Sequence, residues 1–150
     1  MSYQNIELID LKRITLEIFN LIALHKEGNV LTLINRFAMY KNEKGENIFQ
    51  IRNQELNNIF MSCCKFELKN AALIIMTDYY PHFKFDLGSI NLRKRTALMI
   101  CIENNMFDVA SELLEYPDSL PELNNKKVDE NFTAIQFIAN KKLSSLQSGI

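Results

Sequence analysis

The feature that most constrains this chain is an internal repeat with a step of 37 or 38 residues. The clearest copy, residues 96–114, consists of two short apolar segments separated at Asn104 and Asn105. Its opening, Thr-Ala-Leu-Met-Ile-Cys-Ile, recurs 37 residues later as Thr-Ala-Ile-Gln-Phe-Ile-Ala from Thr133. Weaker copies lie upstream at 59–75 and 21–34. Repeats of this length are single supersecondary units that bury a core only by stacking on their neighbours.

Each unit has the pattern of a helical pair. In the second half of the clearest copy, the apolar residues of 106–114 follow the i, i+3, i+4, i+7 spacing of an amphipathic helix. The first half, 97–102, is apolar on all sides, as expected of a helix packed between neighbours. Asparagine between them tolerates the left-handed backbone that a tight turn needs. Thr133 and Gln136 match a capping box, which indicates another helix start. The sequence therefore predicts an all-α fold.

Length and composition are those of one domain. A chain of 150 residues with 47% hydrophobic residues can bury a core as a single unit, so we expect one domain over 1–150. Residues 1–20 are predicted to form a capping helix, 21–25 a separate first helix, and 26–29 a turn before the second helix. The predicted repeats cover about 21–40, 51–76, 90–115 and 123–146, with a fraying C-terminal end.

The threonine-initiated helices and the polar segments before them resemble the ankyrin repeat. That family has a loop or β-hairpin finger followed by two antiparallel helices, with a core reading Thr-Pro-Leu-His-x-Ala-Ala. The segments from Thr96 and Thr133 are similar, with Ala in place of Pro and Met or Gln in place of His. Finger-like segments precede the helices at 51–57, 90–93 and 123–131. The family's turn glycines are mostly absent, and the step exceeds its usual period of about 33 residues. HEAT or armadillo repeats, with a period of about 40–47 residues, are the alternative.

The resemblance implies a helical solenoid that recognises another protein and needs no cofactor. In such arrays the fingers and first helices line one extended face. The family's variable contact positions, carried over by matching the motif, form one group in each unit. They are Gln54, Glu55, Asn57, Lys65 and Phe66; then Arg93, Arg95, Met99, Glu103 and Asn104; and last Asp129, Glu130, Phe132, Gln136 and Asn140.

The charge balance disfavours nucleic acid and membrane partners. The chain has 17 Lys and Arg against 18 Asp and Glu, so no long-range field attracts it to a polyanion. The one basic cluster, residues 93–95, is ordinary for a finger. Apolar runs such as 71–76 are far shorter than the roughly 18–20 residues of a membrane span, and the sequence opens without a secretory signal. We therefore expect a cytoplasmic protein with no nucleic acid and no membrane partner.

The residue pattern indicates no catalytic or metal site. The four glycines are not grouped, which excludes phosphate-binding loops. Cys63, Cys64 and Cys101 lie in apolar runs without zinc spacing, so we expect buried thiols in a reducing compartment. Neither His25 nor His82 is placed for catalysis or metal binding. The sequence predicts no enzyme, no metal and no cofactor.

Three functional hypotheses remain. The first is a cytosolic protein-binding module, either monomeric or a weak homodimer. The composition of the chain, rich in Ile, Asn and Lys, suggests an AT-rich genome. Such an origin fits a viral or bacterial effector that acts on host proteins. The second is a structural or self-associating solenoid with an exposed apolar C-terminal end. The third, an enzyme, requires a fold that brings Cys and His together in a pocket.

A cluster of aromatic residues in the long segment before the third unit has two interpretations. Tyr79, Tyr80, Phe83 and Phe85 lie within seven positions of one another. We expect them to pack this segment back onto the helices. The alternative is an exposed aromatic anchor for a partner.

Overall fold

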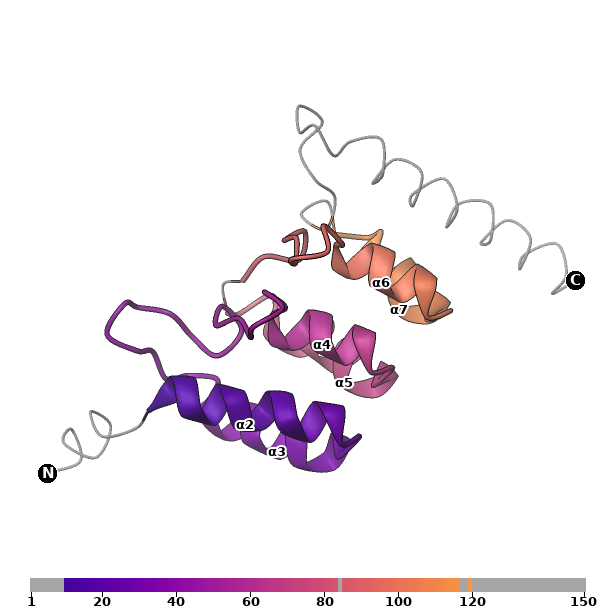
Figure 1. Ribbon diagram of the computed structural model, residues 1–150. Helices are drawn as coiled ribbons and strands as arrows, with labels where there is room; N and C mark the ends of the chain where they lie inside the picture. The colour runs from indigo at the N-terminus through magenta and orange to yellow at the C-terminus, as the bar shows by residue number, and fades with distance from the viewer. Residues whose placement is uncertain (1–9, 84, 117–118, 120–150) are drawn as a thin grey trace, which may run out of the picture.

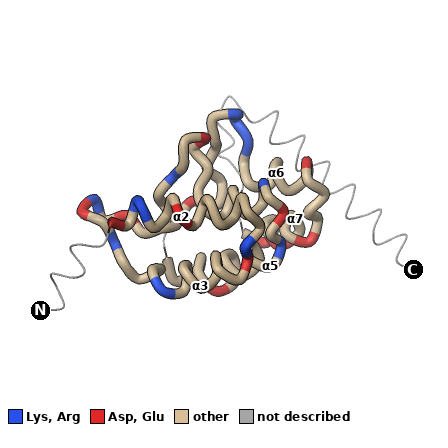
Figure 2. Tube along the Cα trace, turned by 60° about the horizontal axis from the view of Figure 1, so that its bottom comes forward, with Lys and Arg blue, Asp and Glu red and all other residues tan. Residues whose placement is uncertain are grey.

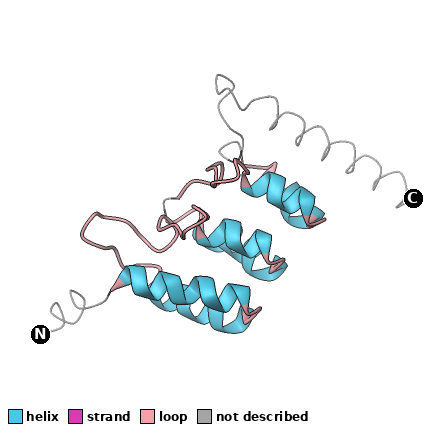
Figure 3. Ribbon diagram, viewed as in Figure 1, coloured by secondary structure: helices cyan, strands magenta, loops and turns pink. Residues whose placement is uncertain are grey.

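All regular structure in the described part of the chain is helical. The computed structural model describes residues 10–83, 85–116 and 119, and Figure 3 shows helices and loops but no strand in these residues. The predicted all-α class is confirmed for this part, while the repeat predicted over 123–146 lies outside it. The elements are α2 (Leu11–Ala23), α3 (Glu27–Phe37), α4 (Ile59–Lys65), α5 (Lys69–Ile74), the π-helical turn η1 (Ile75–Tyr79), α6 (Ala97–Glu103) and α7 (Phe107–Leu113).

The helices form three antiparallel pairs that stack side by side. α2 packs on α3, α4 on α5, and α6 on α7. In addition, α4 contacts both α2 and α6, while α5 contacts both α3 and α7. Figure 1 shows the resulting arrangement, in which the pairs follow one another like steps. Each pair covers an apolar face of its neighbour, which is how stacked repeats acquire a common core.

The turn inside each pair has the same geometry in all three copies. One residue takes the left-handed conformation, and the N–H of the next residue donates to a carbonyl five positions earlier, as in a Schellman motif. The left-handed residues are His25, Glu67 and Asn105, with φ of 58°, 61° and 59°. The closing hydrogen bonds run from Lys26 to Leu21 (2.9 Å), from Leu68 to Cys63 (2.8 Å) and from Met106 to Cys101 (2.8 Å).

The first pair differs from the prediction. Leu11 to Ala23 form one continuous helix, where the sequence predicted a capping helix over 1–20 and a separate helix over 21–25. No glycine or proline interrupts this span, and Leu11, Ile18 and Ile22 lie on one buried face. The turn comes at Leu24 to Lys26, earlier than the predicted 26–29, so Gly28 falls in the first turn of α3.

The first helices of the second and third pairs are enclosed. Residues 59–64 of α4 are all buried, and residues 97–101 of α6 are at most 7% exposed. Side chains cap both helices at equivalent positions: Asn58 Oδ1 accepts from Met61 N–H at 2.8 Å, and Thr96 Oγ1 accepts from Met99 N–H at 3.2 Å. The three cysteines are free and buried, as predicted. Of these helices, α4 lies at the centre of the three described pairs, between α2 and α6.

The aromatic cluster packs onto the helices, which confirms the expectation for the long segment before α6. Phe49, which is 1% exposed, lies at its centre. The Phe49 ring stacks on Phe85 with centroids 5.1 Å apart and also contacts Tyr79 and Phe83. Tyr80 meets Phe85 edge-on at 5.2 Å. Residues 47–51 are thus joined to residues 79–83 and 85 by ring contacts.

Candidate interaction surface

Two loops before the first helices share one turn. We call residues 51–57 the first finger and residues 90–95 the second finger. In the first, Asn53 N–H donates to Asn57 O at 3.0 Å. In the second, Asn91 N–H donates to Arg95 O at 3.1 Å. The side-chain Oδ1 of each asparagine accepts two backbone N–H groups of its own finger at 2.9–3.0 Å. Asparagine at the head of a finger therefore fixes its shape.

The two fingers are bonded to each other. Leu92 N–H donates to Glu55 O at 2.9 Å, and Asn91 Nδ2 donates to Asn57 Oδ1 at 2.9 Å. Arg52 Nη1 donates to Ile90 O at 3.1 Å. Side chains carried by both fingers thus keep a fixed spacing. Figure 2 shows the basic run of the second finger at its tip, projecting beyond the helices.

An ion pair joins each finger to the last residue of the helix that follows it. In the first finger, Glu55 accepts from Lys65 Nζ at 2.7 Å. In the second, Arg95 Nε lies 3.3 Å from Glu103 Oε2. The finger carries the acid in one pair and the base in the other. Neighbouring repeats therefore carry the same ion pair with the positions of acid and base exchanged. Because the side chains are 36–54% exposed, each pair contributes little to stability.

The C-terminal end of α4 is tied to both neighbouring pairs. Asn104 Nδ2 donates to Cys64 O at 3.0 Å and to Lys65 O at 3.1 Å. On the other side, His25 Nε2 lies 3.0 Å from Phe66 O, and the two rings meet edge-on at 6.1 Å. The surface beyond the fingers is consequently rigid where one pair joins the next.

The structure separates the sequence-predicted contact residues into accessible and buried groups. Gln54, Arg93 and Glu103 are exposed, while Glu55, Lys65, Phe66, Arg95 and Asn104 are partly exposed. Asn57 and Met99 are only 1% and 7% exposed. Asn57 binds the second finger and Met99 packs in α6, so neither presents its side chain to a partner. The other five predicted contacts, Asp129, Glu130, Phe132, Gln136 and Asn140, lie outside the described residues.

Four exposed finger residues escaped the motif comparison: Arg52, Leu56, Leu92 and Lys94. Leu56 and Leu92 are 41% and 64% exposed. A sequence signal for both existed, because each is an isolated leucine inside a polar segment between helices. Neither leucine lies at a contact position of the repeat motif that the sequence resembles.

The finger turn has one position at which the backbone is left-handed. The loop that follows α3 contains a third copy of the finger turn, headed by Asn42, which closes through Gly45 N–H to Asn42 O at 2.9 Å. Gly45 has a φ of 77°, and glycine takes this left-handed conformation without steric cost. The equivalent residues of the two fingers are Leu56 and Lys94, with φ of 62° and 61°. Both fingers thus hold large side chains where the backbone favours glycine.

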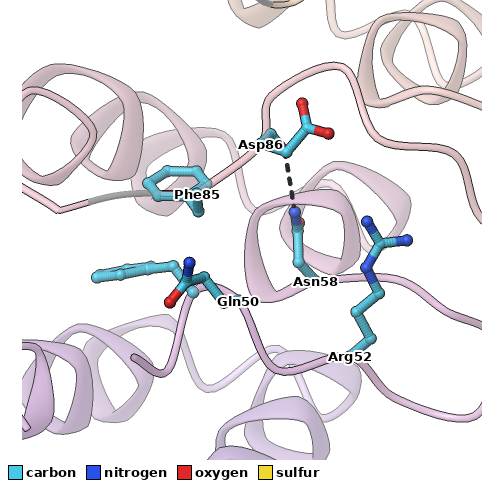
Figure 4. Close-up of a pocket in the computed structure, with 6 residues that line it drawn as sticks. Gln50, Arg52, Asn58, Phe85 and Asp86 are labelled. Carbon is cyan, nitrogen blue, oxygen red and sulfur yellow. Dashed lines mark hydrogen bonds between the residues drawn. The ribbon is translucent and has the colours of Figure 1, made fainter. Parts of the chain in front are cut away.

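A shallow recess lies behind the first finger (Figure 4). It has a volume of about 300 Å³ and is lined by Phe49, Gln50, Arg52, Asn58, Phe85 and Asp86. Asn58 Nδ2 donates across it to Asp86 O at 3.3 Å. The Arg52 guanidinium is held by main-chain carbonyls, so it does not reach Asp86 as a bidentate partner. The recess has two aromatic and four polar lining residues, and none of them is a nucleophile beside a base.

The buried thiols and the metal-binding residue types were the remaining candidates for chemistry in the described residues. Burial raises the pKa of the Cys63 and Cys64 thiols well above the ordinary value, with the Glu27 carboxylate adding to the effect at Cys63. These thiols are therefore protonated and unreactive at neutral pH. Among residues 10–83, 85–116 and 119 no three His, Cys, Asp or Glu side chains gather as metal ligands, and no helix there is long and apolar enough to cross a membrane.

No protein-family model, no curated protein and no solved structure matches this chain. What the chain does must accordingly be inferred from its own surface. The two fingers carry exposed charged and apolar residues on adjoining loops.

Proposed function

We propose that this chain is a protein-binding module that contacts its partner through the two fingers and the ends of α4 and α6. The observation that carries the proposal is the pair of bonded fingers, which have one backbone design but different exposed side chains. A rigid frame with variable contact residues is how repeat arrays recognise partners. Pre-ordered fingers also lower the entropy lost on binding.

The proposed architecture is an ankyrin-like array. Support comes from the stacked helical pairs, the threonine cap of α6 and the finger preceding each of the last two described pairs. In this proposal the module acts in the cytoplasm without cofactor or catalysis, and a viral or bacterial effector that binds a host protein is its natural setting. The contact set consists of Gln54, Glu55, Lys65, Phe66, Arg93, Arg95, Glu103 and Asn104.

The test is affinity capture from a eukaryotic lysate, which compares the intact chain with a variant whose surface charges are exchanged. The variant Arg95→Glu with Glu103→Lys keeps an ion pair but reverses its direction, so the fold is retained while the surface pattern changes. The matched control is Lys69→Glu with Asp108→Lys, which swaps the ion pair between α5 and α7 in the layer of second helices. Circular dichroism checks that both variants are helical.

A partner captured by the intact chain and by the control, but lost by the finger variant, supports the proposal. A partner lost equally by both variants, or retained by both, contradicts the assignment of the surface. If no partner is captured and light scattering shows a mass that rises with concentration, the self-associating alternative is correct.

A further inference from the structure

We propose that the finger tips bind an acidic peptide segment that carries apolar side chains. The docking surface, here called the tip surface, consists of Arg52, Leu56, Leu92, Arg93 and Lys94. This inference rests on the proposed function and names the chemistry of the partner. Exposure and charge point to it separately.

The apolar part of the tip surface consists of two leucines brought together by the backbone. Leu56 and Leu92 are 41% and 64% exposed. They come from different fingers, but the hydrogen bond from Leu92 N–H to Glu55 O places residue 92 beside the peptide unit that joins Glu55 to Leu56. Two exposed leucines on adjoining, fixed loops suit apolar side chains spaced along a single peptide.

The charged part of the tip surface is basic and uncompensated. Glu55 and Arg95 are each occupied by an ion pair within their own repeat. Arg93 and Lys94 have no carboxylate partner within the described residues. Arg52 donates only to the main-chain carbonyls of Leu56 (3.4 Å) and Ile90 (3.1 Å), which orient its guanidinium without neutralising it. Three cations beside two leucines attract carboxylates, because complementary charge is what steers and orients such contacts.

The backbone allows glycine in place of Leu56 and Lys94. Both occupy the left-handed position that Gly45 fills in the third copy of the turn. A side chain at this position is unfavourable for folding. His25, Glu67 and Asn105 take the same conformation in the turns within the pairs, so the conformation is a general feature of the turns in this chain, and the inference rests on exposure and charge. Glycine at positions 56 and 94 therefore removes the side chains while keeping the turn.

The same features favour a peptide over a nucleic acid. Phosphate recognition uses basic side chains in number and gains little from exposed leucines, whereas protein contacts combine apolar anchors with complementary charge. With 17 basic and 18 acidic residues, the chain also lacks the net positive charge that attracts a polyanion. An acidic, leucine-compatible peptide satisfies both halves of the tip surface.

The experiment selects random dodecapeptides displayed on phage against the full chain. An enriched peptide is then synthesised with a fluorescent label and titrated by fluorescence anisotropy. We expect selected peptides to combine Asp or Glu with Leu, Ile, Met or Phe. Leu56→Gly, and separately Arg93→Ala with Lys94→Gly, should each weaken binding about tenfold or more. Glycine at positions 56 and 94 fits the backbone, so these variants keep the fold.

The matched control removes two exposed cations from the loop that carries Gly45. Lys41→Ala with Lys44→Ala lowers the net charge by the same amount but leaves the fingers intact, and should change the affinity less than about twofold. Selected peptides that lack acidic residues, or an affinity that Leu56→Gly leaves unchanged, overturn the inference. So does a single-stranded oligonucleotide that binds more tightly than the peptide.

Failure of the inference and failure of the proposed function give different results. If the peptide contacts are wrong but the module binds a protein through other finger residues, the partner captured from the lysate is still lost in the variant Arg95→Glu with Glu103→Lys. If the chain is not a binding module, neither peptide selection nor lysate capture yields a ligand that depends on the fingers.

Discussion

The helices and the fingers of this chain repeat in different ways. With a step of 38 residues, Met61 corresponds to Met99 and Cys63 to Cys101, so side chains as well as backbone recur in the helices. In the fingers the backbone turn recurs, but Glu55 corresponds to Arg93 and Leu56 to Lys94. Packing limits what the helices can hold, because α4 and α5 each pack against both neighbouring pairs. The fingers meet solvent, so their differing side chains are available for recognition.

The largest expected effect is the loss of stability caused by truncating a core residue of a helix. Phe60 in α4 is 1% exposed, and Phe60→Ala leaves a cavity in the middle of the stack. We expect a loss of about 3–5 kcal/mol in the free energy of unfolding, measured by urea titration. The matched finger variant Leu92→Ala removes an exposed side chain and should cost less than about 0.5 kcal/mol. Equal losses for both would contradict the division between helices and fingers.

A smaller effect is expected at the residue that shapes the second finger. Asn91→Ala removes two bonds to the finger backbone at 2.9 Å and 3.0 Å and the bond to Asn57 at 2.9 Å. Asn57 is buried, so its amide oxygen loses a partner, and we expect about 1–3 kcal/mol of destabilisation in the same titration. The comparison is Asn42→Ala, which removes the two equivalent turn bonds and a bond from Asn42 Nδ2 to Glu46 at 3.0 Å, so that each variant loses three bonds but only Asn91→Ala loses a link between fingers. A larger loss for Asn42→Ala than for Asn91→Ala would contradict the contribution expected from the contact between fingers.

Sequence reasoning predicted the helices better than the fingers. Amphipathic spacing and caps come from nearby residues, so the pairs around Asn104 and Asn105 were predicted correctly. The break between 1–20 and 21–25 was wrong, because the pattern suggested a separate cap where no helix-breaking residue exists. Leu56 was missed because it does not lie at a contact position of the motif, although an isolated leucine in a polar segment is visible in the sequence. Burial of Asn57 and Met99 follows from contacts with neighbouring repeats, which a motif comparison does not describe.

Substitution at the left-handed turn position should have opposite effects on stability in the loop after α3 and in the first finger. Gly45→Ala meets no atom within 4 Å, so its cost is conformational and should be about 1 kcal/mol. Leu56→Gly relieves the same strain and should leave the thermal midpoint unchanged or raise it by a few degrees, about 2–6 °C. Differential scanning calorimetry measures both. A substantial loss for Leu56→Gly would mean that packing of the Leu56 side chain outweighs the strain of its backbone.

The smallest expected effect is a difference in coupling energy between the ion pairs of the two fingers. Lys65 Nζ contacts both oxygens of Glu55, at 2.7 Å and 3.0 Å, whereas Arg95 makes one contact with Glu103 at 3.3 Å. Double-mutant cycles to alanine should give coupling energies of about 0.2–1 kcal/mol, with the Glu55 pair at the upper end. Because these groups are partly exposed, the coupling should fall toward zero in about 1 M salt. A coupling that persists in salt would instead place the ion pairs among the interactions that hold the fingers against the helices, so that they could not be exchanged freely for recognition.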